Sequence, residues 1–177
     1  SFHHILSQTN GGLRAREYLE KRGIDTDIQK DFLLGYAPAE RGWLFNFLRK
    51  KNYSDQFLAE SGLFSKRYRE VALFWNRIIF PIRNVRGDVI AFGGRIVEGD
   101  GPKYINSPET PLFHKSRTLY GLHKALPAIR KERRFILAEG YLDVIAFHRA
   151  GIPGCVAPLG TAVTSEQVRM LKRYAGE

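Results

Sequence analysis

Residues 134–143 read RFILAEGYLD and place two carboxylates around the junction of an expected strand and an expected helix. The run 135–138 is short, continuous and apolar, which is typical of a strand buried on both faces. Gly140 ends this run, and the residues that follow fit a helix. Glu139 is therefore expected at the carboxyl end of a strand, the edge at which open α/β sheets bind ligands. Asp143 falls in the first helical turn, where exposed amides and the macrodipole favour a negative charge.

A second strand and helix are expected directly after this stretch. Residues 155–157 are apolar and predict a short strand, and residues 159–162 read LGTA and predict a turn. Thr164 and Gln167 then form a capping box for a helix that continues through Tyr174. Two strand–helix units in series imply right-handed crossovers and a parallel sheet.

The amino-terminal part is expected to form small packed helices. Glycine, proline and capping residues separate segments with apolar residues at helical spacing. These segments are residues 13–22, 26–34, 43–50 and 54–61. Their aromatic side chains are expected in the core, since large apolar side chains are usually buried. The aromatic residues are Trp43, Phe45, Phe47 and Phe57.

The next part of the chain is rich in β-branched and aromatic residues, which predicts an antiparallel sheet. The expected strands are residues 71–75, 77–82, 89–93 and 95–98. Residues 84–88 read NVRGD and favour a hairpin turn. Gly93 and Gly94 indicate a bulge or the close approach of another backbone. We expect an ordered but irregular crossing segment over residues 103–115, and then a helix over residues 119–129.

The composition of the chain is strongly basic. Its 177 residues include 28 Lys plus Arg against 18 Asp plus Glu, for a net charge of +10. This length suits one domain or two tightly joined subdomains. A pI near 9.9 indicates a polyanionic partner, above all nucleic acid, although a basic solvated surface needs no ligand. No apolar run is long enough to span a membrane, and no signal-peptide pattern opens the chain.

Cysteine and histidine show no metal-binding pattern. The single cysteine, Cys155, excludes an intrachain disulfide and fits a reducing cytoplasm. Because it lies in an apolar strand, we expect it to be buried. The five histidines lack the spacing of metal ligands and are interpreted as non-ligands.

Motifs spread over most of the chain resemble the catalytic core of the bacterial replicative primases (DnaG-type). In order, they are FPIR at 80–83, AFGGR at 91–95, PKYINSPET at 102–110, FHK at 113–115, LYG at 119–121, EGYLD at 139–143 and LGT at 159–161. The segment AREYLEKRG at 15–23 looks like the same family. The EGxxD element alone is shared more widely by Toprim domains, which occur in primases, topoisomerases and some nucleases. The specific signal is therefore the whole set of motifs in this order.

The resemblance implies an α+β amino-terminal subdomain, made of small helices plus an antiparallel sheet, followed by a truncated α/β Toprim subdomain with a Rossmann-like parallel sheet. The expected division is residues 1–130 for the first and residues 131–177 for the first two strand–helix units of the Toprim domain. The family also has a third Toprim strand with a DxD motif and a separate zinc-binding module ahead of the core. We therefore expect this chain to be a fragment.

The resemblance also implies nucleotidyl transfer, in which a 3′-hydroxyl attacks an α-phosphate and divalent ions neutralise the developing charge. Carboxylates would hold Mg²⁺ or Mn²⁺. We expect Glu139 to bind the metal directly, or to orient or deprotonate the attacking hydroxyl. Asp143 either orients the site without binding the metal itself, or is only a favourable charge at the start of a helix. Because other acidic ligands are missing, the chain is expected to bind metal weakly and to be nearly inactive.

A basic groove beside the acidic site is implied as well. The positions expected to meet template backbone or incoming triphosphate are Arg16, Arg77, Arg83, Arg95, Lys103, Tyr104, Asn106 and Lys115. Arg and Lys bind phosphate, and Tyr104 can stack on an unpaired base. For any one of these cations, the alternative is a solvated or carboxylate-paired surface charge. Trp75 stands where many relatives have a basic residue, which removes one template contact or converts it to stacking.

The implied activity is that of a DNA primase, a DNA-directed RNA polymerase that makes short RNA primers on single-stranded DNA in the bacterial cytoplasm. Expected partners are the template, ribonucleoside triphosphates, the RNA–DNA hybrid product and, through the full-length protein, the replicative helicase and the single-stranded DNA-binding protein. Zinc is expected only in the absent amino-terminal module. Two alternatives stay open: a single-stranded nucleic-acid-binding module without catalysis, and a Toprim nuclease or topoisomerase-like enzyme.

Overall fold

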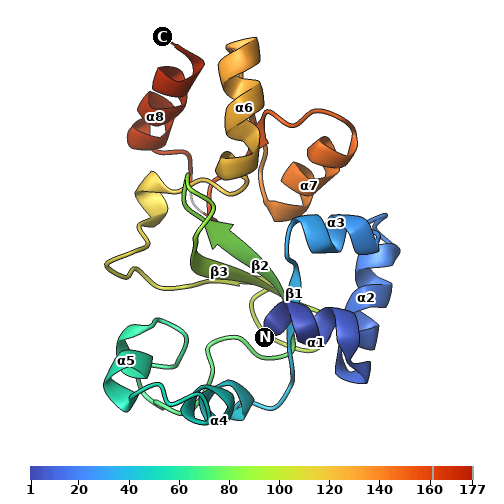
Figure 1. Cartoon of the computed structure of the whole chain (residues 1–177), viewed down its shortest axis with the longest axis vertical. Coiled ribbons are helices and arrows are strands. Elements are labelled where there is room, and N and C mark those ends of the chain that lie inside the picture. The colour runs from blue at the N-terminus through green and yellow to red at the C-terminus, as the bar shows by residue number, and fades with distance from the viewer. Residues whose placement is uncertain (161, 177) are drawn as a thin grey trace. The chain divides into compact units, whose positions relative to one another are not determined.

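The computed structural model of the protein describes residues 1–160 and 162–176, and Figure 1 labels its α-helices and some of its strands. The chain divides into two compact units, the first made of Ser1–Phe80 and Gly93–Thr110, and the second of Pro81–Phe92 and Pro111–Glu177. The subdomain boundary expected at residue 130 stays a prediction. Among the described residues, no helix has the length and apolar composition of a membrane span.

The first unit contains short helices and most of a four-stranded sheet. The helices are α1 (Phe2–Gln8), the 3-10 helix η1 (Asn10–Gly12), α2 (Leu13–Glu20), α3 (Thr26–Asp31), α4 (Trp43–Arg49) and α5 (Asp55–Glu60). The side chains of Asp25 and Ser54 begin α3 and α5 by accepting hydrogen bonds from the N–H groups of Ile28 and Phe57. The helices predicted between residues 13 and 61 are therefore confirmed.

The helix α1 and the strand β1 (Gly35–Ala37) were not predicted, and they pack against each other. Phe2 and Leu6 are buried on this side of α1. A Cβ atom at Gly35 would lie 2.5 Å from the Cβ atom of Phe2, so glycine allows the helix to approach the strand. Both elements are too short to show a hydrophobic period of their own. They form because each is buried by the other, which a local sequence pattern does not show.

The sheet has the strand order β1-β2-β3-β4. The remaining strands are β2 (Arg77–Arg83), β3 (Val89–Ile96) and β4 (Tyr104–Asn106). The pairs β1–β2 and β3–β4 are antiparallel. The predicted hairpin turn is present, since the N–H of Asn84 donates to the carbonyl of Asp88 at 3.0 Å and Gly87 has a φ of 92°. The predicted antiparallel sheet is confirmed.

The strand predicted at residues 71–75 is wrong. Only an isolated bridge between Phe64 and Ala72 forms there. Asn76 has a φ of 48°, which turns the backbone just before β2 begins. Within this segment Phe74 instead fills the core, where it is fully buried, while Val71 and Trp75 are only half-buried.

The two strands predicted on either side of Gly94 are one strand, β3. It runs in unbroken register past β4, with Gly93 opposite Asn106 and Gly94 opposite Ile105, so no bulge forms. A Cβ atom at Gly94 would lie 2.6 Å from the ring of Phe74, so the close neighbour is a side chain and not another backbone. The segment predicted as irregular therefore contains β4, which forms because it pairs with β3.

The prediction that the aromatics of α4 and α5 fill the core is wrong for Phe47 and Phe57. Their exposed fractions are 37% and 57%, while Trp43 and Phe45 are half-buried. The ring of Phe57 stacks on that of Tyr53 with a centroid distance of 5.3 Å. Each ring covers part of the other's face at the surface. This stacking shields the rings from water although neither lies in the core.

The second unit contains a parallel pair of strands with helices. Its elements are the 3-10 helix η2 (Lys115–Arg117), α6 (Leu122–Glu132), β5 (Ile136–Leu137), α7 (Tyr141–Arg149), β6 (Cys155–Val156) and α8 (Ser165–Ala175). The strands β5 and β6 are parallel. Gln167 N–H donates to Thr164 Oγ1 at 3.1 Å, and Thr164 N–H donates to Gln167 Oε1 at 3.0 Å. The predicted capping box and parallel arrangement are confirmed, but the turn predicted at 159–162 includes residue 161, which lies outside the described residues.

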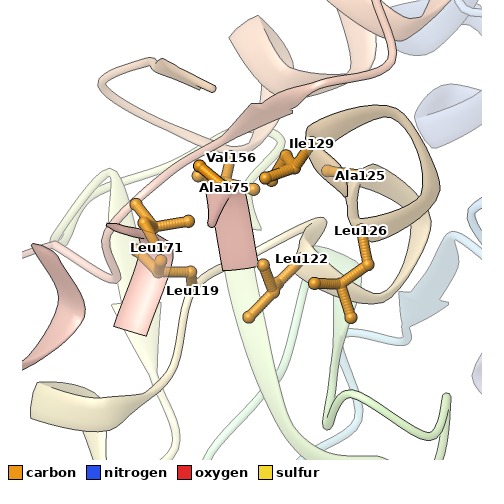
Figure 2. Close-up of a cluster of buried hydrophobic side chains, with 8 residues drawn as sticks. All are labelled: Leu119, Leu122, Ala125, Leu126, Ile129, Val156, Leu171 and Ala175. Carbon is orange, nitrogen blue, oxygen red and sulfur yellow. The ribbon is translucent and has the colours of Figure 1, made fainter. Parts of the chain in front are cut away.

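A buried cluster holds α6 against α8 and β6, as Figure 2 shows. Its members are Leu119, Leu122, Ala125, Leu126, Ile129, Val156, Leu171 and Ala175. The members on α6 lie at positions i, i+3, i+4 and i+7, which is the spacing of one helix face. This apolar face fixes α6 beside β6, the strand that pairs with β5.

The prediction that residues 135–138 are buried on both faces is wrong. Leu137 is 39% exposed, and Phe135, Ile136 and Ala138 are only half-buried. Among the described strands, β5 pairs with β6 alone. One edge of β5 therefore has no neighbouring strand in the part of the chain that the structure describes.

Gly121 sets the start of α6, which begins three residues later than predicted. Its φ of 79° lies in the left-handed region, and a Cβ atom there would lie 2.7 Å from Cγ1 of Val144. We expect Gly121→Ala to lower the free energy of unfolding by about 2 to 4 kcal/mol, through backbone strain plus overpacking. Gly151 is the matched control, since its φ is 77° and a Cβ atom added there would have no neighbour within 4 Å.

Gly151→Ala should cost only the backbone strain, about 1 kcal/mol. Urea unfolding of both variants measures the difference. Equal losses would show that Val144 and its surroundings adjust to the added methyl group and that the approach of α6 to α7 is not tight.

Candidate active site

Glu139 lies at the carboxyl end of β5, as the sequence predicts. The N–H of Ala138 donates to the carbonyl of Val156 at 2.9 Å and extends the parallel ladder by one residue. Glu139 comes directly after this bond, ahead of α7, and its side chain is exposed. In parallel sheets, this edge is where ligands are bound, and contact of the Glu139 carboxylate with a ligand stays a prediction.

Asp143 lies in the first turn of α7 and is exposed. Its Oδ2 atom accepts a hydrogen bond of 3.1 Å from the N–H of Gly140, the residue that precedes the helix. This contact satisfies one of the free N–H groups at the start of the helix. Asp143 therefore has a structural role as a helix cap, and a further role in the site stays a prediction.

Cys155 lies in β6 and is fully buried, as expected from its apolar strand. Burial, and next the charge of Asp143, raise the pKa of its thiol to about 11. The folded protein therefore favours the neutral thiol, which does not react as a nucleophile.

We expect this thiol to resist a disulfide reagent at pH 8 in the folded protein and to react at once after unfolding in urea. The stability that Cys155 contributes is complete below its unfolded pKa of about 8.5. It should be lost as the pH rises through the folded pKa of about 11. The check is the urea midpoint from pH 8 to 11 for the parent and for Cys155→Ala. An equal pH dependence in both would contradict the assignment.

The carboxylates of the second unit suit a hard divalent cation. Mg²⁺ binds carboxylate oxygens, takes only one or two of them and keeps several waters. Glu139 and Asp143 supply two exposed carboxylates within five residues of chain. No group of three or more His, Cys, Asp or Glu side chains is arranged to hold a metal within residues 1–160 and 162–176.

Two of the predicted basic residues also belong to the second unit. Arg83 is half-buried at the end of β2, and its Nη1 donates to the carbonyl of Gly87 at 3.3 Å. Burial raises the pKa of the Tyr120 hydroxyl, Tyr141 adds to this, and the charge on Arg83 opposes it. Lys115 begins η2, where its carbonyl accepts a bond of 2.9 Å from Nε2 of Gln167. That bond fixes the backbone from which the Lys115 side chain extends.

Arg95 and Tyr104 form a pair across β3 and β4 in the first unit. They lie opposite each other in the strand register, and Nη1 of Arg95 donates to the Tyr104 hydroxyl at 2.6 Å. The Arg95 guanidinium also lies 4.9 Å from the ring centroid of Tyr18, a partner that no local pattern could identify because it comes from α2. Tyr104 is 37% exposed, Asn106 shares its face of β4, and Lys103 is exposed.

Arg77 and Arg16 make contacts within the protein that the sequence did not predict. Arg77 is only 3% exposed, and its Nη1 donates to the carbonyls of Gly94 and Pro102. Burial lowers the pKa of its guanidinium. Nη1 of Arg16 donates to the carbonyls of Leu6 and Thr9 at the end of α1. Both residues therefore stabilise the fold, and contact with phosphate stays a prediction for each.

Trp75 has a cation over its ring, supplied by a residue far away in the sequence. The Arg41 guanidinium lies 4.2 Å from the ring centroid of Trp75, and the Arg41 carbonyl accepts a bond of 2.8 Å from the N–H of Ala72. The Arg41 guanidinium thus places a positive charge next to Trp75. The sequence alone could not have indicated Arg41, because the pair depends on the fold.

Comparison with protein families identifies both parts of the chain. A model of the DNA primase catalytic core, N-terminal domain, matches residues 2–126, and a Toprim domain model matches residues 133–177. The chain is 46% identical over 174 residues to a DNA primase of Treponema pallidum, covering 98% of this chain and 29% of that protein. It is 47% identical over 177 residues to a DNA primase of Halalkalibacterium halodurans, covering 98% of this chain and 30% of that protein. The chain thus spans less than a third of these relatives.

Solved structures agree with the sequence relatives. The RNA polymerase domain of the Mycobacterium tuberculosis primase DnaG, in complex with a double-stranded DNA oligomer with a 6-nucleotide overhang, has a TM-score of 0.92 and 34% identity, and covers 98% of this chain and 55% of that one. A DnaG primase catalytic domain bound to single-stranded DNA has a TM-score of 0.86 and 38% identity, and covers 98% and 56%. The motifs, the fold and both domain models agree, and the chain belongs to the family of bacterial DnaG-type DNA primases.

Proposed function

We propose that this chain carries part of the active site of a DNA primase, which makes short RNA primers on single-stranded DNA by metal-dependent nucleotidyl transfer. The observation that carries the proposal is the exposed Glu139 carboxylate at the carboxyl end of β5, within the Toprim part of a primase-family chain. Because the Glu139 carboxylate is exposed at this edge, it can contact a ligand directly.

In this proposal, Glu139 holds a divalent cation or orients the attacking 3′-hydroxyl. Bound Mg²⁺ or Mn²⁺ would neutralise the charge that develops on the phosphate oxygens. Asp143 holds the start of α7 through Gly140 and thereby fixes the backbone that follows Glu139. Acidic ligands from a further strand would complete the site, so the chain by itself should bind metal weakly and be nearly inactive.

The basic residues are proposed to bind the template and the incoming ribonucleoside triphosphate. Lys103 supplies an exposed charge, and Tyr104 supplies a ring that Arg95 holds in place. Arg83 and Lys115 are proposed contacts for phosphate, because forked and point-like cations both bind phosphate. Asn106 is proposed to contact the template backbone. Arg16 and Arg77 would have to use nitrogens other than Nη1, which already bonds to backbone carbonyls.

At the length of its relatives, the protein is proposed to act with further partners. These are the RNA–DNA hybrid product, the replicative helicase and the single-stranded DNA-binding protein. For the single-stranded DNA template itself, support comes from the structure of a relative's catalytic domain bound to single-stranded DNA.

The test is incorporation of labelled ribonucleotides on a single-stranded DNA template, by a polypeptide that contains this chain at the length of its relatives. Incorporation that needs Mg²⁺ or Mn²⁺ and stops with a chelator is the expected result. Binding of single-stranded DNA with no incorporation under any divalent cation would overturn the proposal and favour a binding module. Cleavage of the template without synthesis would favour a Toprim nuclease.

A further inference from the structure

A basic loop in the first unit carries an exposed aromatic ring and has no role in the site described above. Residues 65–70 read SKRYRE, and Lys66, Arg67 and Arg69 are all exposed. Between them, Tyr68 is 57% exposed. An exposed ring flanked by cations is the combination that binds single strands, because the cations meet phosphates and the ring stacks on a base.

The backbone of this loop is held in one conformation. Its base is closed by a bond of 2.9 Å from the N–H of Ser65 to the carbonyl of Val71. At the tip, Oγ of Ser65 accepts from the N–H groups of Arg67 and Tyr68 at 3.3 and 3.2 Å. A further bond of 3.0 Å joins Val71 N–H to the Tyr68 carbonyl. The loop is therefore preorganised, which lowers the entropy lost when it binds a ligand.

The cations of the loop are available to an external anion. Lys66, Arg67 and Arg69 form no ion pair with any carboxylate of the described residues. The guanidinium of Arg67 lies 5.3 Å from the ring centroid of Tyr68, so the ring already has a cation beside it.

A cavity of about 240 Å³ adjoins the loop and is lined by Lys66 and Arg69 together with Glu60 and Glu109. Its charges balance, so it does not suit a phosphate. The ligand must instead meet the solvent-facing side of the loop, where three cations and the Tyr68 ring are exposed.

We propose that the loop of residues 65–70 is an additional contact for single-stranded nucleic acid. Lys66 and Arg69 bind its phosphates, and the ring of Tyr68, with Arg67 beside it, stacks on an unpaired base. A duplex cannot use this contact fully because its bases are already stacked. An acidic polypeptide could use the cations but gains nothing from the ring. The identification of the strand as a primer template rests on the proposed function, but the binding itself does not.

The experiment measures binding of a fluorescein-labelled oligothymidylate to this chain by anisotropy, in chelator so that no divalent cation takes part. Tyr68→Ala should weaken binding about tenfold, and Tyr68→Phe should change it by less than about twofold, because the ring stacks and the hydroxyl does not. Lys66→Gln combined with Arg69→Gln should reduce the slope of log K against log salt by about 1.4, since each phosphate contact to a single strand contributes about 0.7.

Matched controls come from another exposed basic segment of the same unit. Tyr53→Ala controls for loss of an exposed ring, and Lys50→Gln combined with Lys51→Gln controls for loss of two charges. These controls should leave the affinity within about twofold of the parent. Circular dichroism and thermal melting check that each variant is folded.

An unchanged affinity in Tyr68→Ala, or equal losses in the loop and control double variants, would overturn the proposal. If poly-L-glutamate also displaced the oligothymidylate as well as unlabelled oligothymidylate does, the loop would be a site for acidic polypeptides instead. Failure of ribonucleotide incorporation would leave this result intact, because binding is measured without metal or nucleotides.

Discussion

Glu139→Gln is expected to reduce template-dependent ribonucleotide incorporation by about 100-fold or more, because neutral amides are poor ligands for Mg²⁺ and cannot accept a proton. The side chain is exposed at the end of β5 and makes no bond that holds the fold among the described residues. The free energy of unfolding should therefore change by less than about 0.5 kcal/mol. The measurement pairs initial incorporation rates with urea unfolding in the same protein preparation.

Glu132→Gln is the control for this substitution. Glu132 is also a glutamate of the second unit, close to β5 in the sequence, and its carboxylate pairs with Nε of Arg134 at 2.9 Å. The pair is largely exposed to solvent and should contribute little to stability. Glu132→Gln should retain the parent rate. If Glu139→Gln were as active as Glu132→Gln, the acidic site would lie elsewhere.

The two interpretations of Asp143 can be separated in the same assay. An asparagine keeps an oxygen that can accept the hydrogen bond from Gly140, so Asp143→Asn should preserve the start of α7. Asp143→Ala should lose that bond and about 1 kcal/mol of stability. If Asp143→Asn is active, the residue serves only as a helix cap. If it is stable but inactive, its negative charge is needed in the site.

The parts of the fold that local chemistry specifies were predictable from the sequence. The capping box of Thr164 and Gln167, the helix that follows Gly140 and the hairpin turn at residues 84–88 all depend on neighbours in the chain. The position of Glu139 was predictable for the same reason, because it needs only a strand before it and a helix after it.

The remaining features depend on contacts between distant segments. β4 forms only because it pairs with β3, and α1 forms with β1, so neither has a pattern of its own. The burial of Arg77 is of the same kind, since the carbonyls that receive its guanidinium belong to Gly94 and Pro102. A sequence shows that an arginine is present, but the choice between phosphate and backbone carbonyl is made by the tertiary structure.

Phe74→Ala is expected to lower the free energy of unfolding by about 3 to 5 kcal/mol, the usual cost of removing a buried aromatic ring. Phe74 is fully buried, and its ring lies against the backbone of β3 at Gly94. The substitution should also disturb the pair of Arg95 and Tyr104. Arg95 follows Gly94 on β3, and Tyr104 lies opposite it on β4. Urea unfolding gives the stability, and the anisotropy of a labelled oligothymidylate, measured where the variant is folded, reports the pair.

Gly94→Ala tests whether this contact is the reason for the glycine. A Cβ atom there would lie 2.6 Å from Cδ1 of Phe74 and 3.1 Å from Cδ of Arg77, so the single variant should be destabilised by about 1 to 3 kcal/mol through overpacking. In a Phe74→Leu background, a smaller side chain replaces the ring that the methyl group would meet, so we expect the methyl group to be less crowded. The double variant should therefore be more stable than the sum of the two single losses predicts, by at least about 0.5 kcal/mol. Additive losses would show that Phe74 and Gly94 do not constrain each other, and that glycine is needed at this position for another reason.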